Sequence, residues 1–136
     1  MTGWASGIGA ITLFTEDLPA SRAFYAEVFR LPTVFEDDVS VAFSLGGTIL
    51  NVLAVSEAPE LITPTPVAGP GSGARLQFTI EVDDVVAVIA ELTGRGVELL
   101  NGPIDRPWGV RTAAFADPAG HVWEVAQQLP EDGISG

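Results

Sequence analysis

The most informative stretch of the sequence is Phe115-Ala116-Asp117-Pro118-Ala119-Gly120-His121-Val122-Trp123-Glu124-Val125, which joins a tight turn to a short apolar strand carrying one carboxylate. In the turn, Asp117 can accept hydrogen bonds from the backbone ahead of it, Pro118 fixes φ, and Gly120 takes a conformation that other residues resist. Because side chains alternate along a strand, Glu124 points to the face opposite Trp123 and Val125. An unpaired buried carboxylate is costly, so we predict that Glu124 faces a ligand, a metal or a hydrogen-bonding partner inside a cavity. The alternative is an edge strand that leaves Glu124 in water.

Length and composition predict one domain spanning residues 1–136. The chain is 47% hydrophobic, which is ample for a core at this length. No apolar run approaches the roughly 20 residues of a membrane span. Residues 1–10 lack the basic start and the apolar core of a signal peptide, so we expect a cytoplasmic protein.

Residue usage excludes several kinds of chemistry. The chain has no cysteine, so disulfides and thiolate sites are excluded, and its single histidine excludes a multi-histidine site within one chain. The formal net charge is −12, and all six basic residues are arginines. We therefore expect no binding to nucleic acid or to anionic membranes, whereas a cationic ligand is attracted. Solubility alone is the other explanation of this charge.

The first half of the chain reads as a strand, a helix and three strands. Residues 8–15 alternate in polarity and are rich in β-formers, and Asp17 followed by Pro19 is typical of a helix start. Pro32 limits the extent of that helix. The predicted elements are a strand at 8–15, a helix at 18–30, and strands at 34–36, 39–45 and 48–55.

The same order returns in the second half. Residues 56–74 are rich in Pro, Gly, Ser and Thr and are predicted to be a linker without a structured element. Asp83 or Asp84 is the predicted cap of the second helix. The predicted elements are a strand at 76–82, a helix up to the glycines at 94–96, strands at 97–100, 110–116 and 122–127, and a frayed tail at 129–136.

Aligning the two halves implies two βαβββ modules, residues 8–55 and 75–128, on either side of the linker. The alignment pairs Ala10 with Gln77, Asp17 with Asp84, and Asn51 with Glu124. Strand parity places the apolar side chains against a helix and the polar ones, including Thr12 and Thr79, on the opposite, concave face. Asn51, Gln77 and Glu124 are therefore expected to line one cavity.

Several motifs in this order and spacing are similar to those of the vicinal oxygen chelate superfamily, which includes glyoxalase I, bleomycin-resistance proteins, extradiol dioxygenases and methylmalonyl-CoA epimerase. The motifs are Ile11-Thr12-Leu13-Phe14, Asp17-Leu18, Ser21 to Phe24-Tyr25, Phe78-Thr79-Ile80-Glu81-Val82-Asp83-Asp84-Val85 and Asp117-Pro118-Ala119-Gly120-His121-Val122-Trp123-Glu124. The resemblance implies an α+β fold of two βαβββ modules, whose eight strands form an incomplete barrel around a pocket. It also implies a homodimer.

The resemblance places metal ligands at the positions of Ala10, Asn51, Gln77 and Glu124. Only Glu124 is a strong ligand there, and Ala10 has no donor atom in its side chain. One carboxylate with two neutral amides is a poor site, so we expect no metal and no other cofactor. A divalent metal is the alternative. His121 lies three residues before Glu124 in an extended strand, points away from it, and is not expected to coordinate metal.

The preferred hypothesis is metal-independent binding and sequestration of a small aromatic or cationic molecule, as in bleomycin-resistance proteins. The alternative is a lyase, an isomerase or an oxygenase that uses Glu124 as a metal ligand or as a general base, so whether the chain is an enzyme stays open. Arg111 could bind a ligand carboxylate or phosphate, or could form a structural ion pair, and the aromatic candidates could be pocket walls or core. The predicted ligand-binding residues are Thr12, Phe14, Phe43, Asn51, Gln77, Thr79, Trp108, Arg111, Phe115 and Glu124.

Overall fold

The computed structural model describes residues 3–130 and divides the chain into two compact units, Met1–Gly69 and Pro70–Gly136. The division falls inside the predicted linker at 56–74. Most of the predicted tail at 129–136 lies outside the described residues. Across residues 3–130, no helix is long and apolar enough to cross a membrane.

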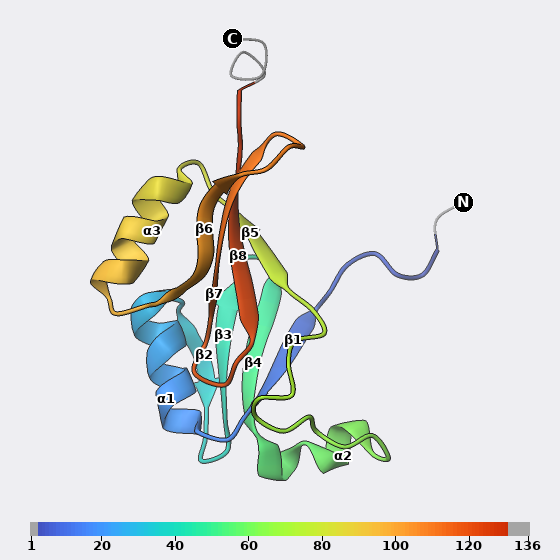
Figure 1. Cartoon of the computed structure of the whole chain (residues 1–136). Coiled ribbons are helices and arrows are strands. Elements are labelled where there is room, and N and C mark those ends of the chain that lie inside the picture. The colour runs from blue at the N-terminus through green and yellow to red at the C-terminus, as the bar shows by residue number, and fades with distance from the viewer. Residues whose placement is uncertain (1–2, 131–136) are drawn as a thin grey trace. The chain divides into compact units, whose positions relative to one another are not determined.

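The first unit is one βαβββ module (Figure 1). Its sheet has the strand order β1-β4-β3-β2, with β1 parallel to β4 and the other pairs antiparallel. The buried side of this sheet carries Leu13, Val41, Phe43, Leu50 and Val52. The elements are β1 (Ala10–Thr15), α1 (Leu18–Ala23), β2 (Thr33–Glu36), β3 (Ser40–Leu45) and β4 (Thr48–Ala54).

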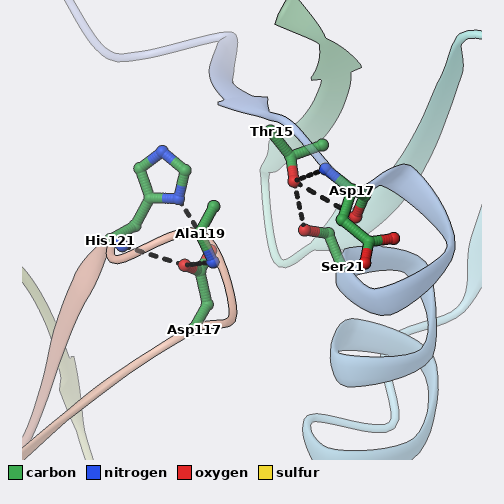
Figure 2. A network of polar contacts seen from close by, with 6 residues as sticks. All are labelled: Thr15, Asp17, Ser21, Asp117, Ala119 and His121. Carbon is green, nitrogen blue, oxygen red and sulfur yellow. Dashed lines mark hydrogen bonds and ion pairs between the residues drawn. The ribbon is translucent and has the colours of Figure 1, made fainter. Parts of the chain in front are cut away.

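Helix α1 begins where the sequence predicts, at Asp17. The Asp17 carboxylate accepts a hydrogen bond from the backbone N–H of Ala20 at 3.1 Å, which satisfies one free donor of the first turn. The hydroxyl of Thr15 accepts from the Asp17 N–H at 3.1 Å and lies 2.8 Å from the hydroxyl of Ser21 (Figure 2). This polar cluster ties the end of β1 to the first turn of the helix.

The predicted helix at 18–30 is only partly α-helical. After Ala23 the chain continues as a π-helical segment, Phe24–Val28, and Arg30 then adopts a left-handed φ of 57°. The π segment places Tyr25 in the core, where its ring lies 5.1 Å from that of Phe29 and 6.0 Å from that of Phe43. A periodicity of 3.6 residues does not anticipate such a local widening.

The second unit repeats the topology of the first. Its sheet has the order β5-β8-β7-β6, with β5 parallel to β8. The elements are β5 (Phe78–Glu81), α3 (Val85–Gly94), β6 (Leu99–Asp105), β7 (Val110–Ala116) and β8 (Val122–Gln128). Two four-stranded mixed sheets, each in a βαβββ unit, confirm the predicted α+β fold class.

Helix α3 covers one face of the second sheet (Figure 1). Asp84, one of the two predicted caps, accepts a hydrogen bond from the Ala87 N–H at 3.1 Å. Val85, Ile89 and Leu92 form the buried stripe of the helix, at the spacing expected for an amphipathic helix.

The segment predicted to be an unstructured linker contains two short helices, so that part of the prediction is wrong. A 3-10 helix spans Val55–Glu57, and α2 spans Pro59–Ile62. Ala58 between them is fully buried. Pro59 at the first turn of α2 has a fixed φ that favours the start of a helix. The composition of the segment, rich in Pro, Gly, Ser and Thr, does not predict this helix.

Strand β6 is longer than the predicted strand at 97–100. It runs through Gly102-Pro103, a pair that reads as a turn in sequence. Gly102 has a φ of +95°, and a Cβ there would lie 2.5 Å from the Thr112 carbonyl oxygen. Only glycine lets the two strands approach this closely, and the strand register shifts on either side of Asn101.

Candidate functional site

The second sheet places Glu124 where strand parity predicts. Glu124 pairs with Thr79 of β5 and with Ala114 of β7, on the face opposite the buried Trp123 and Val125. The Thr79 hydroxyl donates a hydrogen bond to Glu124 Oε1 at 2.8 Å. Oε2 of this half-buried carboxylate accepts no hydrogen bond within the described residues, so it is available to a ligand.

The first sheet carries the corresponding pair. Thr12 of β1 lies beside Asn51 of β4, and Asn51 Nδ2 is 3.5 Å from Thr12 Oγ1, at the long limit of a hydrogen bond. Each unit therefore places a threonine from its first strand next to a polar residue of its last strand, at the same point of the sheet. The aligned halves predict this correspondence of Asn51 with Glu124.

Two other predicted residues lie close to these pairs. Phe14 shares the face of Thr12 and is half-buried. Gln77 is exposed and lies just before β5, rather than inside the predicted strand at 76–82. The prediction that Asn51, Gln77 and Glu124 line one cavity stays a prediction.

Phe43 and Phe115 do not belong to the polar faces, which corrects their prediction as pocket walls. Phe43 pairs with the buried Leu50, packs against Tyr25, and is itself fully buried. Phe115 pairs with Trp123 and is 1% exposed. Both lie on the helix side of their sheets because the hydrophobic core of each unit is built there. Trp108 is 72% exposed in the turn between β6 and β7.

Arg111 lies on the helix side, opposite the Glu124 face, and its role as a ligand-binding residue stays a prediction. Its strand partner Gln127 accepts a hydrogen bond from the first N–H of α3, at Val85. Arg111 donates to Asp105 at 2.6 and 3.1 Å, the structural ion pair that was the alternative. This hydrogen bonding is the main cause that lowers the pKa of the Asp105 carboxyl below its ordinary value.

Arg106 lies on the Glu124 face and is not among the residues predicted from the sequence. Its Nε donates to the Thr112 hydroxyl at 2.9 Å, and Thr112 is 2% exposed. Thr112 pairs with Ala126, two residues along β8 from Glu124, so both side chains occupy the same face. Alternation along the β6–β7 hairpin could have identified Arg106. Once the register of the two strands is known, Ile104 and Arg106 fall on the same side as Thr112.

The Asp-Pro-x-Gly turn that begins at Asp117 has the predicted hydrogen bonds (Figure 2). Asp117 Oδ1 accepts from the backbone N–H groups of Ala119 at 3.0 Å and His121 at 2.8 Å, and Gly120 has a φ of +97°. Asp117 Oδ2 lies 2.8 Å from His121 Nδ1. The histidine is thus held by the turn at the entrance of β8.

A shallow depression of about 290 Å³ lies where β5 and β8 end. Glu81, which lines this depression, pairs with Ala126 two residues further along the strands than the Thr79–Glu124 pair. Its carboxylate therefore adds negative charge on the same face as Glu124. The lining residues are Glu81, Val82, Asp83, Ala126, Gln127 and Gln128.

The residues at the four expected metal positions fit a metal poorly. Ala10 offers no donor atom, Gln77 and Asn51 are neutral amides, and one oxygen of Glu124 is already hydrogen-bonded to Thr79. Within residues 3–130, no three His, Cys, Asp or Glu side chains gather in a way that could hold a metal. The absence of a metal from the working protein stays a prediction.

Comparisons with known proteins point to one family. The family model of the Glyoxalase/Bleomycin resistance protein/Dioxygenase superfamily matches residues 7–125. A crystal structure of a glyoxalase/bleomycin resistance protein/dioxygenase from Nocardioides is 28% identical with a TM-score of 0.82, and the match covers 94% of this chain and 87% of that one. Lactoylglutathione lyase from Agrobacterium tumefaciens is 25% identical with a TM-score of 0.74, covering 92% and 96%.

An uncharacterised protein of Mycobacterium bovis is also similar, with 25% identity over 130 residues that cover 88% of this chain and 82% of the relative. Because the family model spans both sheets and the turn before Glu124, this chain belongs to the Glyoxalase/Bleomycin resistance protein/Dioxygenase superfamily.

Proposed function

We propose that the chain binds a small aromatic or cationic molecule without a metal and sequesters it, with Glu124 as the group that receives the cation. The observation that carries the proposal is the Glu124 carboxylate: Thr79 holds one oxygen at 2.8 Å and leaves the other for a ligand. A preoriented carboxylate loses less entropy on binding than a mobile one. The net charge of −12 favours a cation over an anion.

Benzylamine, an aromatic monocation, is a suitable probe. We expect Glu124→Gln to keep the fold and to weaken benzylamine binding by about 1 to 3 kcal/mol, the range for a lost charge-assisted hydrogen bond. Binding is measured by chemical-shift titration of the labelled protein.

Glu98→Gln is the matched control, because Glu98 is exposed just before β6 and the charge change is the same. Equal weakening by both variants would show that only the overall field attracts the probe. Metal analysis of protein purified without chelator completes the test, since a stoichiometric metal lost on Glu124→Gln would contradict metal-independent binding.

Catalysis is the second candidate function. It is favoured by the likeness to lactoylglutathione lyase and to a glyoxalase-related enzyme from Fulvimarina pelagi, which is 28% identical with a TM-score of 0.79. In this reading Glu124 is a general base that removes a proton from the bound molecule. Incubation with lactoylglutathione tests this alternative. Turnover by the wild type and by Glu98→Gln, but not by Glu124→Gln, would favour catalysis over simple binding as the function.

A further inference from the structure

Arg106 is a cation without an acidic partner on the face that carries Glu124. Three of the six arginines form ion pairs with carboxylates, at Glu36, Glu91 and Asp105. Within the described residues, the side chain of Arg106 has one polar contact, the hydrogen bond from Nε to Thr112. Its terminal Nη groups are therefore available to a ligand.

The hairpin holds Arg106 firmly at both ends. The Arg106 N–H donates to the Val110 carbonyl at 2.7 Å, and the Arg106 carbonyl accepts from the Gly109 N–H at 3.1 Å. At the far end, the buried Thr112 hydroxyl fixes Nε. A guanidinium with its backbone and Nε both fixed is preorganised for two parallel hydrogen bonds to a carboxylate.

The strand register places Thr112, the residue that holds Arg106, near Glu124. Thr112 is the diagonal neighbour of Glu124 across β7 and β8, and such neighbours lie roughly 7–8 Å apart between Cα atoms. The two charged groups do not form an ion pair with each other, because no such contact occurs within 4.0 Å. Each is held by its own threonine, Glu124 by Thr79 and Arg106 by Thr112.

We propose that Arg106 is an anion-binding residue of the Glu124 face and that the ligand is an aromatic zwitterion, with its cation at Glu124 and its carboxylate at Arg106. This inference rests on the proposed function, because it takes Glu124 as the cation-binding group. It restricts the expected ligands to molecules that carry a carboxylate as well as a cation, since a simple cation has no group that could bind Arg106. In a chain with a net charge of −12, an anion needs a specific partner of this kind to bind at all.

Three related probes test the proposal: 4-(aminomethyl)benzoate, which has both charges on one ring, benzylamine, which lacks the carboxylate, and 4-methylbenzoate, which lacks the ammonium group. We expect the zwitterion to bind about five- to tenfold more tightly than benzylamine, the gain for one added charge-assisted contact. Arg106→Gln should remove this advantage and leave the benzylamine dissociation constant within about twofold. Titrations use the whole chain, and thermal unfolding confirms that each variant is folded.

Two further variants make the test specific. Arg75→Gln, at an exposed position before β5, carries the same charge change and should keep the zwitterion advantage. Thr112→Val removes the hydroxyl that positions Arg106 while keeping its charge, so it should reduce zwitterion binding and leave benzylamine binding unchanged.

Several results would overturn the proposal: a zwitterion that binds no better than benzylamine, an Arg106→Gln variant that weakens both probes equally, or an equal effect of Arg75→Gln. Failure of the proposed function has a different signature. In that case Glu124→Gln leaves benzylamine binding unchanged, whereas 4-methylbenzoate binding still depends on Arg106. Failure of all three probes to bind at millimolar concentration would contradict both.

Discussion

Asp117 is the single residue on which the Asp-Pro-x-Gly turn depends most. Its buried carboxylate accepts hydrogen bonds from the N–H groups of Ala119 and His121 and contacts the His121 ring. We expect Asp117→Ala to lower the free energy of unfolding by about 2 to 4 kcal/mol, because it leaves two partly buried backbone N–H donors unpaired. Urea unfolding measures the change.

Asp117→Asn is the control for this prediction, since its amide oxygen can still accept the two backbone hydrogen bonds. It should cost clearly less than Asp117→Ala. An alanine variant as stable as the wild type would contradict a structural role for the carboxylate.

The polar residues of the site are predictable from sequence only where one strand decides their side. Glu124 follows from its alternation with Trp123 and Val125. Arg111 lies on the side of Phe115 by the same alternation within β7. The side of Arg106 depends instead on how β6 and β7 pair through the hairpin. That pairing joins two strands, so alternation along one strand does not predict that Arg106 lies on the Glu124 face.

Among the secondary structure elements, helix α3 offers a clean test of its predicted cap. Asp84 accepts from Ala87, whereas the adjacent Asp83 makes no capping hydrogen bond within the described residues. We expect Asp84→Ala to destabilise the protein by about 1 kcal/mol, the usual cost of losing an N-cap. Asp83→Ala has the same change of charge and should cost little. Equal losses in thermal unfolding would assign the effect to charge.

The turn between β2 and β3 predicts an acid-sensitive contribution to stability. Hydrogen bonds from the N–H of Val39, and from the hydroxyl and N–H of Ser40, lower the pKa of Asp37 below its ordinary value of 3.8. The folded state therefore gains stability from this group above about pH 4 and loses it as the pH falls through the lower folded pKa.

We expect Asp37→Asn to flatten the loss of stability between about pH 4 and pH 2, because its amide does not titrate. Unfolding curves recorded at several pH values check this. An unchanged acid slope would show that other carboxylates dominate.

The succession of strands and helices along each unit and the helix caps could be predicted because their signals are local: alternation, capping aspartates and turn glycines. The π-helical segment at Phe24–Val28 and the extension of β6 through Gly102-Pro103 could not. The first depends on where Tyr25 packs, and the second on how closely Gly102 approaches Thr112. Both are tertiary contacts that a sequence window does not contain.

For the molecule as a whole, the segment predicted as a linker, residues 56–74, is not uniform. Ala58 is buried between two short helices, whereas residues 68–73 are exposed and form no helix or strand. We expect deletion of residues 68–70 to change the free energy of unfolding by no more than about 1 kcal/mol, and deletion of residues 59–61 to cost more. Similar losses in urea unfolding would contradict the distinction.

Exposed strand edges lead us to expect a homodimer. The edge strand β2 exposes Val34 and Phe35, and the edge strand β6 exposes Leu100 and Ile104. Apolar side chains on unpaired edges favour association with a second copy. Light scattering at micromolar concentration should therefore give twice the chain mass, and a monomer mass would refute the prediction.

The pair Thr12–Asn51 in the first unit is equivalent to the pair Thr79–Glu124 in the second unit. One sheet holds an amide where the other holds a carboxylate. The two units of the same chain therefore differ at this position much as a wild-type protein differs from a charge-neutralising variant. Exchanging the two residues, as Asn51→Glu with Glu124→Asn, would move the charge from one unit to the other while conserving composition. Ligand preference in such a swapped chain would report which unit carries the chemistry.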